Sequence, residues 1–374
     1  MPNPTQKRIL VYPYDRRFCP LVAYRDILGK TTFFNTLISP NGWGLTGKDA
    51  GYADSRRNLG IIVNNDDNIN EDIKNNDIFL AASGDWNAGI REKALKYMHL
   101  AIDLKKDIWC AIKLSGDELL LMRDKCSAAK VNFRYFMPKL SAAVSKTIFE
   151  KPQKLYKPDA AVIFVTEVVD DTNGYDVLLS LYQSFKNAGH NVSAIGNRTD
   201  CELMGFHSMP EFITDAQSNA KQVIDYFNNY IKYILTTERS DVIIINIPDC
   251  LTKYDDILTC GYGVIPYLIS QAVQPDYVIA CIPCGEVDGA KLLNLSESCK
   301  YRFGFEIDFF HMSNVHVDYN ASISKLGLSY DYLDFCMVEE TIMECSSDNE
   351  ITICNILDGN GDFAFRHILS LIES

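Results

Sequence analysis

Short apolar runs alternate with helical patterns along nearly the whole chain of 374 residues. In residues 90–105, for example, Ala94, Tyr97, Met98 and Ala101 recur at helical spacing, and residues 107–113 then read as an apolar strand. This alternation predicts parallel sheets with helices packed on them. Because the chain is too long for one ordinary core, we expect an α/β protein of two domains, each with a mainly parallel sheet.

The alternation predicts six strands in each half of the chain. The predicted strands are residues 8–12, 32–38, 59–63, 77–82, 107–113, 132–136, 161–166, 191–195, 241–247, 276–282, 303–310 and 350–356. Residues 64–76 are rich in Asn and Asp and are expected to form a solvated loop. Residues 150–159 contain two Pro and three Lys without apolar periodicity, so we predict a linker there, with domains at 1–150 and 151–374. The carboxyl ends of the two sheets are expected to border a shared cleft.

One predicted strand, residues 160–166, leads through an acidic loop into an amphipathic helix, residues 175–188. A P-loop nucleotidase holds its phosphates at such a strand–loop–helix, with glycines for close backbone approach and a lysine on the phosphates. This loop has one glycine, no lysine and three carboxylates, so the Walker A motif is degenerate. We expect ATP and GTP to bind weakly or not at all. The ligand-binding candidates here are Asp170, Asp171, Thr172 and Asn173.

A second loop nearly matches the Walker spacing GxxxxGK[ST], but Asp49 replaces the hydroxyl residue that would hold Mg²⁺, and no strong helix follows. We therefore expect a ligand-facing loop at the end of a strand, with stacking by Trp43 and charge from Lys48. The alternative is a glycine-rich surface turn. The candidates in this loop are Gly42, Trp43, Gly44, Gly47, Lys48 and Asp49.

Two further segments carry polar candidates. Residues 196–211 contain Arg198, Glu202 and His207 among small residues, which is typical either of a site or of a loop held by its own side chains. The apolar run 241–247 is followed by Asp249, as in a Walker B strand, where an acid contacts a metal-bound water. The sequence assigns no catalytic residue.

Twelve cysteines without a secretion signal indicate reduced thiols in the cytoplasm. Residues 1–7 are too short and polar for a signal peptide, and no stretch approaches the roughly 20 apolar residues of a membrane span. The CxxC pair Cys281 and Cys284 is a weak metal candidate, because a zinc site needs two more ligands. Dithiol redox chemistry and buried inert thiols are the alternatives, and we expect most thiols to be unliganded.

The two halves of the chain differ in net charge. Residues 1–150 contain 22 Lys+Arg and 17 Asp+Glu, a net of +5, whereas residues 151–374 contain 14 and 32, a net of −18. The acidic half would repel nucleic acid and anionic membrane, so we expect neither as a partner. It could attract a basic peptide, a basic protein face or a cation. The alternative is that the acids serve only solubility.

Residues 160–290 resemble the P-loop fold of dethiobiotin-synthetase-like proteins that carry an N-terminal Rossmann-like domain. The resemblance rests on the order of strand, phosphate loop, helix, the loop IGNRTDCELMGFHSMP, a long helix, the strand VIIINIPD and the segment QAVQPDYVIACIPCG. Gly174 stands where that family has its phosphate-loop lysine. The resemblance implies a Rossmann-like domain at 1–150 and a degenerate P-loop-like domain at 151–374.

The whole chain, including NGWGLTGKDAG, is also similar to clostridial peptide-maturation-system proteins, which accompany radical-SAM enzymes that modify ribosomal peptides. This implies an accessory binding or scaffold protein of peptide maturation that contacts the precursor peptide or its radical-SAM enzyme. The alternative is a nucleotide- or metal-dependent enzyme acting in the interdomain cleft, with Lys48, Arg198, His207 and Asp249 as polar candidates.

Overall fold

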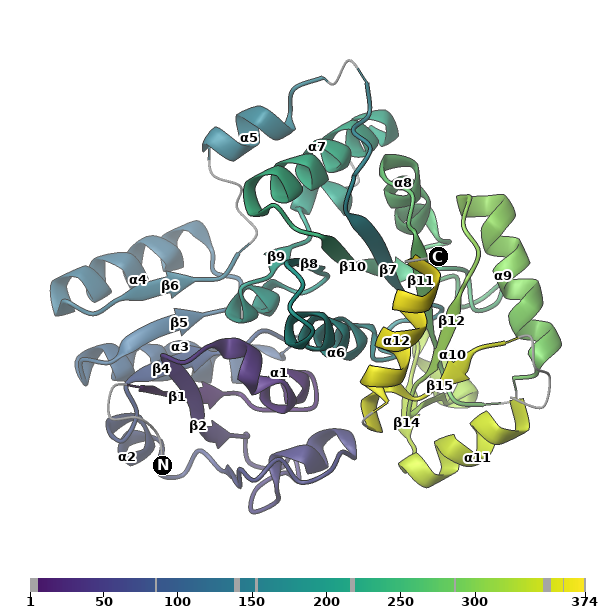
Figure 1. Cartoon of the computed structure of the whole chain (residues 1–374). Helices are drawn as coiled ribbons and strands as arrows, with labels where there is room; N and C mark the ends of the chain where they lie inside the picture. Colours follow the sequence, from purple (N-terminus) through teal and green to yellow (C-terminus); the bar gives the residue numbers. More distant parts are fainter. Residues whose placement is uncertain are drawn as a thin grey trace. The chain divides into compact units, whose positions relative to one another are not determined.

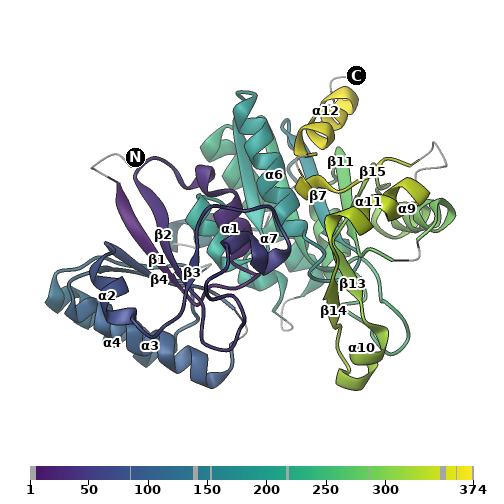
Figure 2. The ribbon, with the colours of Figure 1, turned by 90° about the horizontal axis from the view of Figure 1, so that it is seen from below.

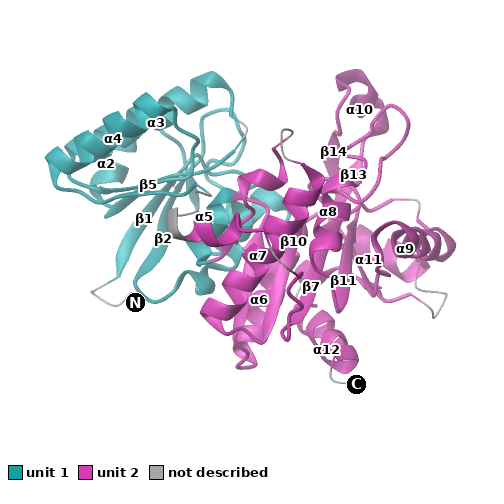
Figure 3. Cartoon of the chain, turned by 90° about the horizontal axis from the view of Figure 1, so that it is seen from above, with its two compact units in different colours: residues 1–137, 199–205 teal, residues 138–198, 206–374 magenta. Residues whose placement is uncertain are grey.

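The computed structural model describes residues 6–84, 86–137, 142–151, 154–215, 219–285, 287–345, 351–358 and 360–372. The chain forms two compact units (Figure 3): Met1–Met137 with Thr199–Gly205 is unit 1, and Pro138–Arg198 with Phe206–Ser374 is unit 2. The division falls earlier than the predicted boundary at residue 150. The reason is that α5 (Ala142–Ile148) packs on unit 2. Its Ile148 side chain is fully buried in the core of that unit, and the Ile148 carbonyl accepts a hydrogen bond from Asn229 Nδ2 at 2.9 Å.

Unit 1 is built on a six-stranded sheet in the order β3-β2-β1-β4-β5-β6 (Figure 1), in which all paired strands are parallel. This is the strand order of a Rossmann-like fold. The strands are β1 (Lys7–Tyr12), β2 (Thr32–Ile38), β3 (Val63–Asn64), β4 (Ile78–Ala81), β5 (Asp107–Cys110) and β6 (Phe133–Tyr135). β1 is central and its last four residues are buried, as expected for a parallel strand covered on both faces.

Helices cover the sheet of unit 1 on both faces. They are α1 (Cys19–Ala23), α2 (Ile69–Lys74), α3 (Ala88–Asp103) and α4 (Gly116–Ala129). α2, α3 and α4 pack on one face, and α1 lies on the other (Figure 2). Two predictions were wrong here. Residues 64–76 are not only a loop, because α2 buries Ile73 against the sheet, and the strand predicted at 59–63 is the two-residue β3.

Unit 2 is built on a seven-stranded parallel sheet in the order β15-β12-β11-β7-β10-β8-β9. The strands are β7 (Ala161–Glu167), β8 (Val192–Gly196), β9 (His207–Ser208), β10 (Val242–Cys250), β11 (Tyr277–Ile282), β12 (Phe309–Met312) and β15 (Ile353–Cys354). β7 lies between β11 and β10, so the acidic loop that follows it starts from the middle of the sheet. The predicted α/β class with two mainly parallel sheets is therefore confirmed.

Helices pack on both faces of the sheet of unit 2. Besides α5, the helices described in this unit are α6 (Gly174–Asn187), α7 (Ala220–Glu238), α8 (Val264–Ala272), α9 (Gly289–Phe303), α10 (Tyr319–Lys325), α11 (Phe335–Cys345) and α12 (Gly361–Ile372). α6 packs on β7, β8 and β10 and against α12, while α7, α8 and α9 share the large apolar core on the other face. Among the described helices, none is both long and apolar enough to cross a lipid bilayer.

A two-stranded antiparallel hairpin stands apart from the large sheet of unit 2. Its strands β13 (Val315–Val317) and β14 (Tyr330–Tyr332) are joined through α10 (Figure 2). The sequence pattern predicted neither strand. The strand predicted at 303–310 was also too long, because Phe303 ends α9 and β12 begins at Phe309. Part of the strand predicted at 350–356 lies outside the described residues.

Candidate functional site

The loop between β7 and α6 lies where a P-loop would bind phosphate, at the carboxyl end of a central strand and the N-terminus of a helix. Glu167, the last residue of β7, turns its carboxylate back to this helix end. Its Oε1 accepts the backbone N–H of Gly174 at 3.1 Å and lies 3.3 Å from the Thr172 hydroxyl oxygen. A free amide of the first helical turn, which would otherwise be open to an anion, is therefore bound by the chain's own carboxyl group.

Glu167 is only 7% exposed. Burial, together with the nearby Asp171 and Asp170, raises the pKa of the Glu167 carboxyl to about 8, although the N–H groups of Gly174 and Thr172 lower it in part. The carboxyl group is therefore mainly neutral at pH 7. A neutral carboxyl group can remain at a helix N-terminus in an acidic loop without adding a further buried charge.

Gly174 leaves no room for the lysine found in a P-loop. A Cβ atom at this position would lie 2.8 Å from Glu167 Cγ and 3.0 Å from Asn246 Nδ2. Asn246 is fully buried in β10, and its Oδ1 has no hydrogen-bond partner among the described residues. The loop thus departs from a nucleotide site in shape as well as in charge.

The backbone of this loop is held in an unusual conformation by internal contacts. Asp171 and Asn173 have positive φ angles of 60° and 68°, which non-glycine residues rarely adopt. The Thr172 hydroxyl donates to the carbonyl of Val169 at 2.8 Å, and Asn173 hydrogen-bonds the hydroxyl of Ser313. Thr172 and Asn173 therefore hold the conformation of the loop. Asp170 and Asp171 are the remaining residues of this loop that could bind a ligand.

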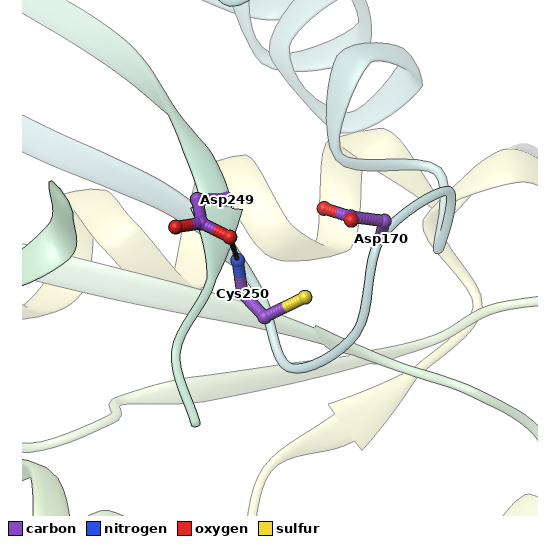
Figure 4. Close-up of side chains that lie close together, drawn as sticks. All are labelled: Asp170, Asp249 and Cys250. Atoms are coloured by element: carbon purple, nitrogen blue, oxygen red, sulfur yellow. Dashed lines mark hydrogen bonds between the residues drawn. The ribbon is translucent and has the colours of Figure 1, made fainter. Parts of the chain in front are cut away.

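Asp170 meets Asp249 and Cys250 at the end of β10 (Figure 4). One carboxylate oxygen from each aspartate and the Cys250 sulfur lie within 4.8 Å of one another. Asp170 is exposed, whereas Cys250 is buried. Burial and the neighbouring Asp249 raise the pKa of Asp170, while a hydrogen bond from the Cys250 thiol opposes them. In the described part of the chain, no Lys or Arg forms an ion pair with either aspartate.

Close backbone contacts place the Asp249 carboxylate in this cluster. Asp249 has a φ of 71°, and its Oδ1 accepts the N–H groups of Cys250 at 2.9 Å and Gly261 at 3.0 Å. A Cβ atom at Gly261 would lie 1.5 Å from Asp249 Oδ2, so glycine is required there. Burial, and then Asp170 and Cys260, raises the pKa of the Cys250 thiol, which is therefore protonated in the free protein. The cluster offers two carboxylates and a thiol to a cation.

The glycine-rich loop of unit 1 is held by its own contacts. Gly42, Gly44 and Gly47 adopt positive φ angles of 91°, 74° and 79°. Asp49 accepts the N–H groups of Gly51, Leu59 and Gly60 at 2.7–2.8 Å, and these hydrogen bonds lower the pKa of its carboxyl group although burial opposes them. Asp49 therefore organises the loop.

The two large side chains of this loop also have partners inside unit 1. The Trp43 ring lies 5.4 Å from that of Trp86, and the Lys48 ammonium lies 3.5 Å from the centre of the Tyr52 ring. These contacts favour the interpretation of the segment as an ordered surface turn.

The polar loop after β8 is not a single cluster. Thr199–Gly205 belongs to unit 1, where Asp200 accepts the Ser83 hydroxyl at 2.8 Å and the Glu202 carbonyl accepts Arg134 at 3.3 Å. In unit 2 the Arg198 guanidinium packs 4.6 Å from the Tyr175 ring. His207 Nε2 lies 2.7 Å from Glu238 Oε1. Arg198, Glu202 and His207 therefore occupy three different environments.

Cys281 and Cys284 belong to the packed interior. Cys281 is fully buried in β11 and Cys284 is 2% exposed, and burial raises the pKa of both thiols. Cys284 Sγ lies 3.5 Å from the Thr341 hydroxyl. The one group of possible metal ligands among the described residues does not include either cysteine, and both are free thiols. The prediction missed Cys250 and Gly261, for which the only local signal was their place in the segment after Asp249.

No protein-family model and no curated protein matches this chain. Among solved structures, the chain is similar to a DUF1611 family protein from Anabaena variabilis, with a TM-score of 0.59 and 9% identity over 98% of this chain and 100% of that chain. This similarity shows a shared fold across both units. Chloroplast FtsY from Physcomitrella patens matches with a TM-score of 0.30 and 14% identity over 80% of this chain and 92% of that one, too low to bear on the fold.

Proposed function

We propose that this chain is an accessory binding protein of ribosomal-peptide maturation, and that unit 2 binds a cationic segment of the precursor peptide or of its modifying enzyme. The pathway rests on the sequence resemblance. The type of ligand rests on one observation, namely that Glu167 takes the phosphate position at the N-terminus of α6 and that Asp170 and Asp249 lie close by.

This arrangement favours a cation over a nucleotide for electrostatic reasons. A triphosphate would have to displace the Glu167 carboxyl group and then lie beside Asp170 and Asp171. Two like charges about 4 Å apart repel by roughly 4 kcal/mol at the effective dielectric constant of a protein surface. A lysine or arginine side chain would instead gain from the same carboxylates, because no cation of the described chain pairs with Asp170 or Asp249.

Peptides that differ only in charge test this proposal. We would use two fluorescein-labelled peptides of equal length, one with lysine and leucine spaced by glycine (the Lys/Leu peptide) and one with glutamate in place of lysine (the Glu/Leu peptide). Fluorescence anisotropy should show binding of the Lys/Leu peptide alone. Affinity should fall on raising the salt concentration from about 50 to about 300 mM, because exposed charge pairs are screened.

The variant Asp170→Asn/Asp249→Asn should bind the Lys/Leu peptide about tenfold or more weakly, in line with the loss of two charge contacts. A matched control is Glu297→Gln/Glu339→Gln, which removes two exposed charges from α9 and α11 and should leave affinity nearly unchanged. Equal binding of both peptides, or no binding of either, would refute the proposal.

A second candidate function is a metal-dependent enzyme, and the Asp170–Asp249–Cys250 cluster is the observation that favours it. Two carboxylates and a thiol would suit a thiophilic divalent cation such as Zn²⁺ better than Mg²⁺. Calorimetric titration with ZnCl₂ would show a site that is lost in Cys250→Ser and in Asp249→Asn, but retained in the control variant Cys336→Ser, which changes an exposed cysteine. Zinc binding that survives both Cys250→Ser and Asp249→Asn would exclude the cluster as the site.

A further inference from the structure

Four tyrosines belong to two segments of unit 2 that contact the acidic loop. Tyr254 follows β10, and Tyr319, Tyr330 and Tyr332 belong to α10 and β14. Together with Asp170, Asp171 and Asp255 they are called here the tyrosine–aspartate surface.

Direct contacts join the parts of this surface. The Tyr254 and Tyr319 rings lie 6.4 Å apart, and the nearby Asp255 carboxylate raises the pKa of Tyr319. The Tyr330 hydroxyl donates to the carbonyl of Asp170 at 2.6 Å. Tyr332 is two positions along the same strand from Tyr330, so both side chains leave β14 on the same face. These contacts join the hairpin to the acidic loop on one side and α10 to the loop after β10 on the other.

The rings of this surface are partly open to solvent. Tyr254 is 39% exposed, and Tyr319 and Tyr332 are each 46% exposed. Ile257, in the same loop as Tyr254, is 57% exposed. Tyrosine is enriched at protein interfaces because it buries a large rigid ring at low entropic cost and keeps a polar tip. An exposed group of such rings beside apolar side chains is typical of a binding surface.

The charge of the surroundings limits what can bind. The segments 167–174, 249–263 and 313–335 contain nine Asp and Glu residues and two lysines. One of those lysines, Lys253, is already paired with Asp256. A lysine or arginine side chain of a partner would contact carboxylates of this surface as well as the faces of its tyrosine rings, and both kinds of group attract cations.

The hairpin also offers backbone groups. In the described part of the chain, β14 pairs with β13 alone, so one of its edges has no neighbouring strand. A free strand edge can accept an extended peptide through main-chain hydrogen bonds, while side chains on alternate positions contact the surface below. An extended segment would thereby bring its basic residues to the tyrosines and aspartates.

We infer that the tyrosine–aspartate surface binds an extended peptide segment in which lysine or arginine alternates with apolar residues. This inference rests on the proposed function and adds two points to it. It gives the place where the peptide binds, and it requires the peptide to have apolar side chains that pack on the exposed tyrosine rings. Charge alone would not produce that requirement.

A third labelled peptide, with serine in place of leucine (the Lys/Ser peptide), tests the requirement for apolar residues. The Lys/Leu peptide should bind about tenfold more tightly than the Lys/Ser peptide. The variant Tyr254→Ala/Tyr319→Ala should lose about tenfold in affinity for the Lys/Leu peptide, as is typical of interface tyrosines. Tyr301→Ala is the matched control, because Tyr301 is 78% exposed on α9 and should contribute less than a twofold change.

The site is mapped with a Lys/Leu peptide that carries a benzophenone group, by mass spectrometry after irradiation. Crosslinks should fall within residues 251–262 or 319–332. If the Lys/Leu peptide binds but the variant Tyr254→Ala/Tyr319→Ala keeps full affinity, or the crosslinks fall elsewhere, the inference is wrong while the proposed function stands. Equal affinity for the Lys/Ser peptide also overturns it. If no lysine peptide binds the wild-type protein, the proposed function fails and the inference fails with it.

Discussion

At the scale of single residues, Glu167 distinguishes this loop from a nucleotide site most clearly. Its carboxyl group binds the first amide of α6 and is held neutral by burial and by its acidic neighbours. The sequence shows that the loop contains an acid at this position. It does not show that the side chain turns back to the helix, because this depends on the absence of a side chain at Gly174 seven residues later.

The pKa of Glu167 predicts how stability changes with pH. The folded-state value of about 8 lies above the ordinary 4.5, so between these values the folded protein holds a proton that the unfolded chain releases. This contribution to stability is complete below about pH 4.5 and is lost as the pH rises toward 8. Urea unfolding from pH 5 to 8 should show stability falling by up to a few kcal/mol in the wild type, and less steeply in Glu167→Gln.

The control for this pH series is Glu297→Gln, which changes an exposed glutamate on α9 and should keep the wild-type slope. A wild-type slope unchanged by Glu167→Gln would show that Glu167 is ionised in the folded protein.

Gly174→Ala tests the close packing at the helix start. Alanine normally stabilises a helix by roughly 1 kcal/mol relative to glycine. Here the new methyl group would lie 2.8 Å from Glu167 Cγ and 3.0 Å from Asn246 Nδ2, so the free energy of unfolding should instead fall by about 1–3 kcal/mol. Gly116→Ala is the control, because Gly116 begins α4 with open space around it and should be neutral or stabilising. Equal effects of the two substitutions would contradict the packing described here.

At the scale of helices and strands, the sequence predicted the long elements well. The 32–38 strand matches β2, and the predicted strand and helix around the acidic loop match β7 and α6 within one residue. Such elements have enough residues to show a clear apolar period. Strands of two or three residues, such as β9, β13 and β14, are too short to show one, and tertiary packing fixes them.

The candidate site follows the same rule. Asp170 and Asp249 could be named because each lies within four residues of the end of a predicted strand. Cys250 and Gly261 could not be assigned roles from the sequence. The contact between Gly261 and Asp249 forms only when the chain between residues 251 and 260 folds back on β10. The tyrosine–aspartate surface was hidden for the same reason, since it brings residue 254 to residue 319.

The segment before β7 is held against α7 by hydrogen bonds between the Tyr156 backbone and the Asn228 side chain. Asn228, fully buried in α7, accepts the N–H of Tyr156 at 2.8 Å and donates to the carbonyls of Tyr156 and Ala272 at 2.9 and 2.8 Å. Asn228→Ala would leave these backbone groups unpaired, so we expect a loss of about 2–4 kcal/mol in the free energy of unfolding.

Asn294→Ala is the comparison for Asn228→Ala, because Asn294 is exposed on α9 and its loss should change stability by less than about 0.5 kcal/mol. Both variants are compared by urea unfolding. A loss below 1 kcal/mol in Asn228→Ala would mean that this segment is not held as described.

At the scale of the whole molecule, the fold and the chemistry of unit 2 point in different directions. The acidic loop follows the end of a central parallel strand and leads into the N-terminus of a helix, which is a common place for ligands to bind in α/β proteins. The residues at that end are carboxylates, and the half of the chain that contains them has a net charge of −18. The position of the loop therefore does not decide what it binds, and the function has to be argued from the side chains.

The most direct test of this account is calorimetric titration of Mg-ATP and Mg-GTP into the purified chain of residues 1–374. The account predicts no binding at concentrations up to about 1 mM, because Glu167 takes the place of a phosphate and Asp170 and Asp171 repel the rest. Micromolar affinity for either nucleotide that is lost in Asp170→Ala/Thr172→Ala, in a variant that remains folded by circular dichroism, would contradict the account.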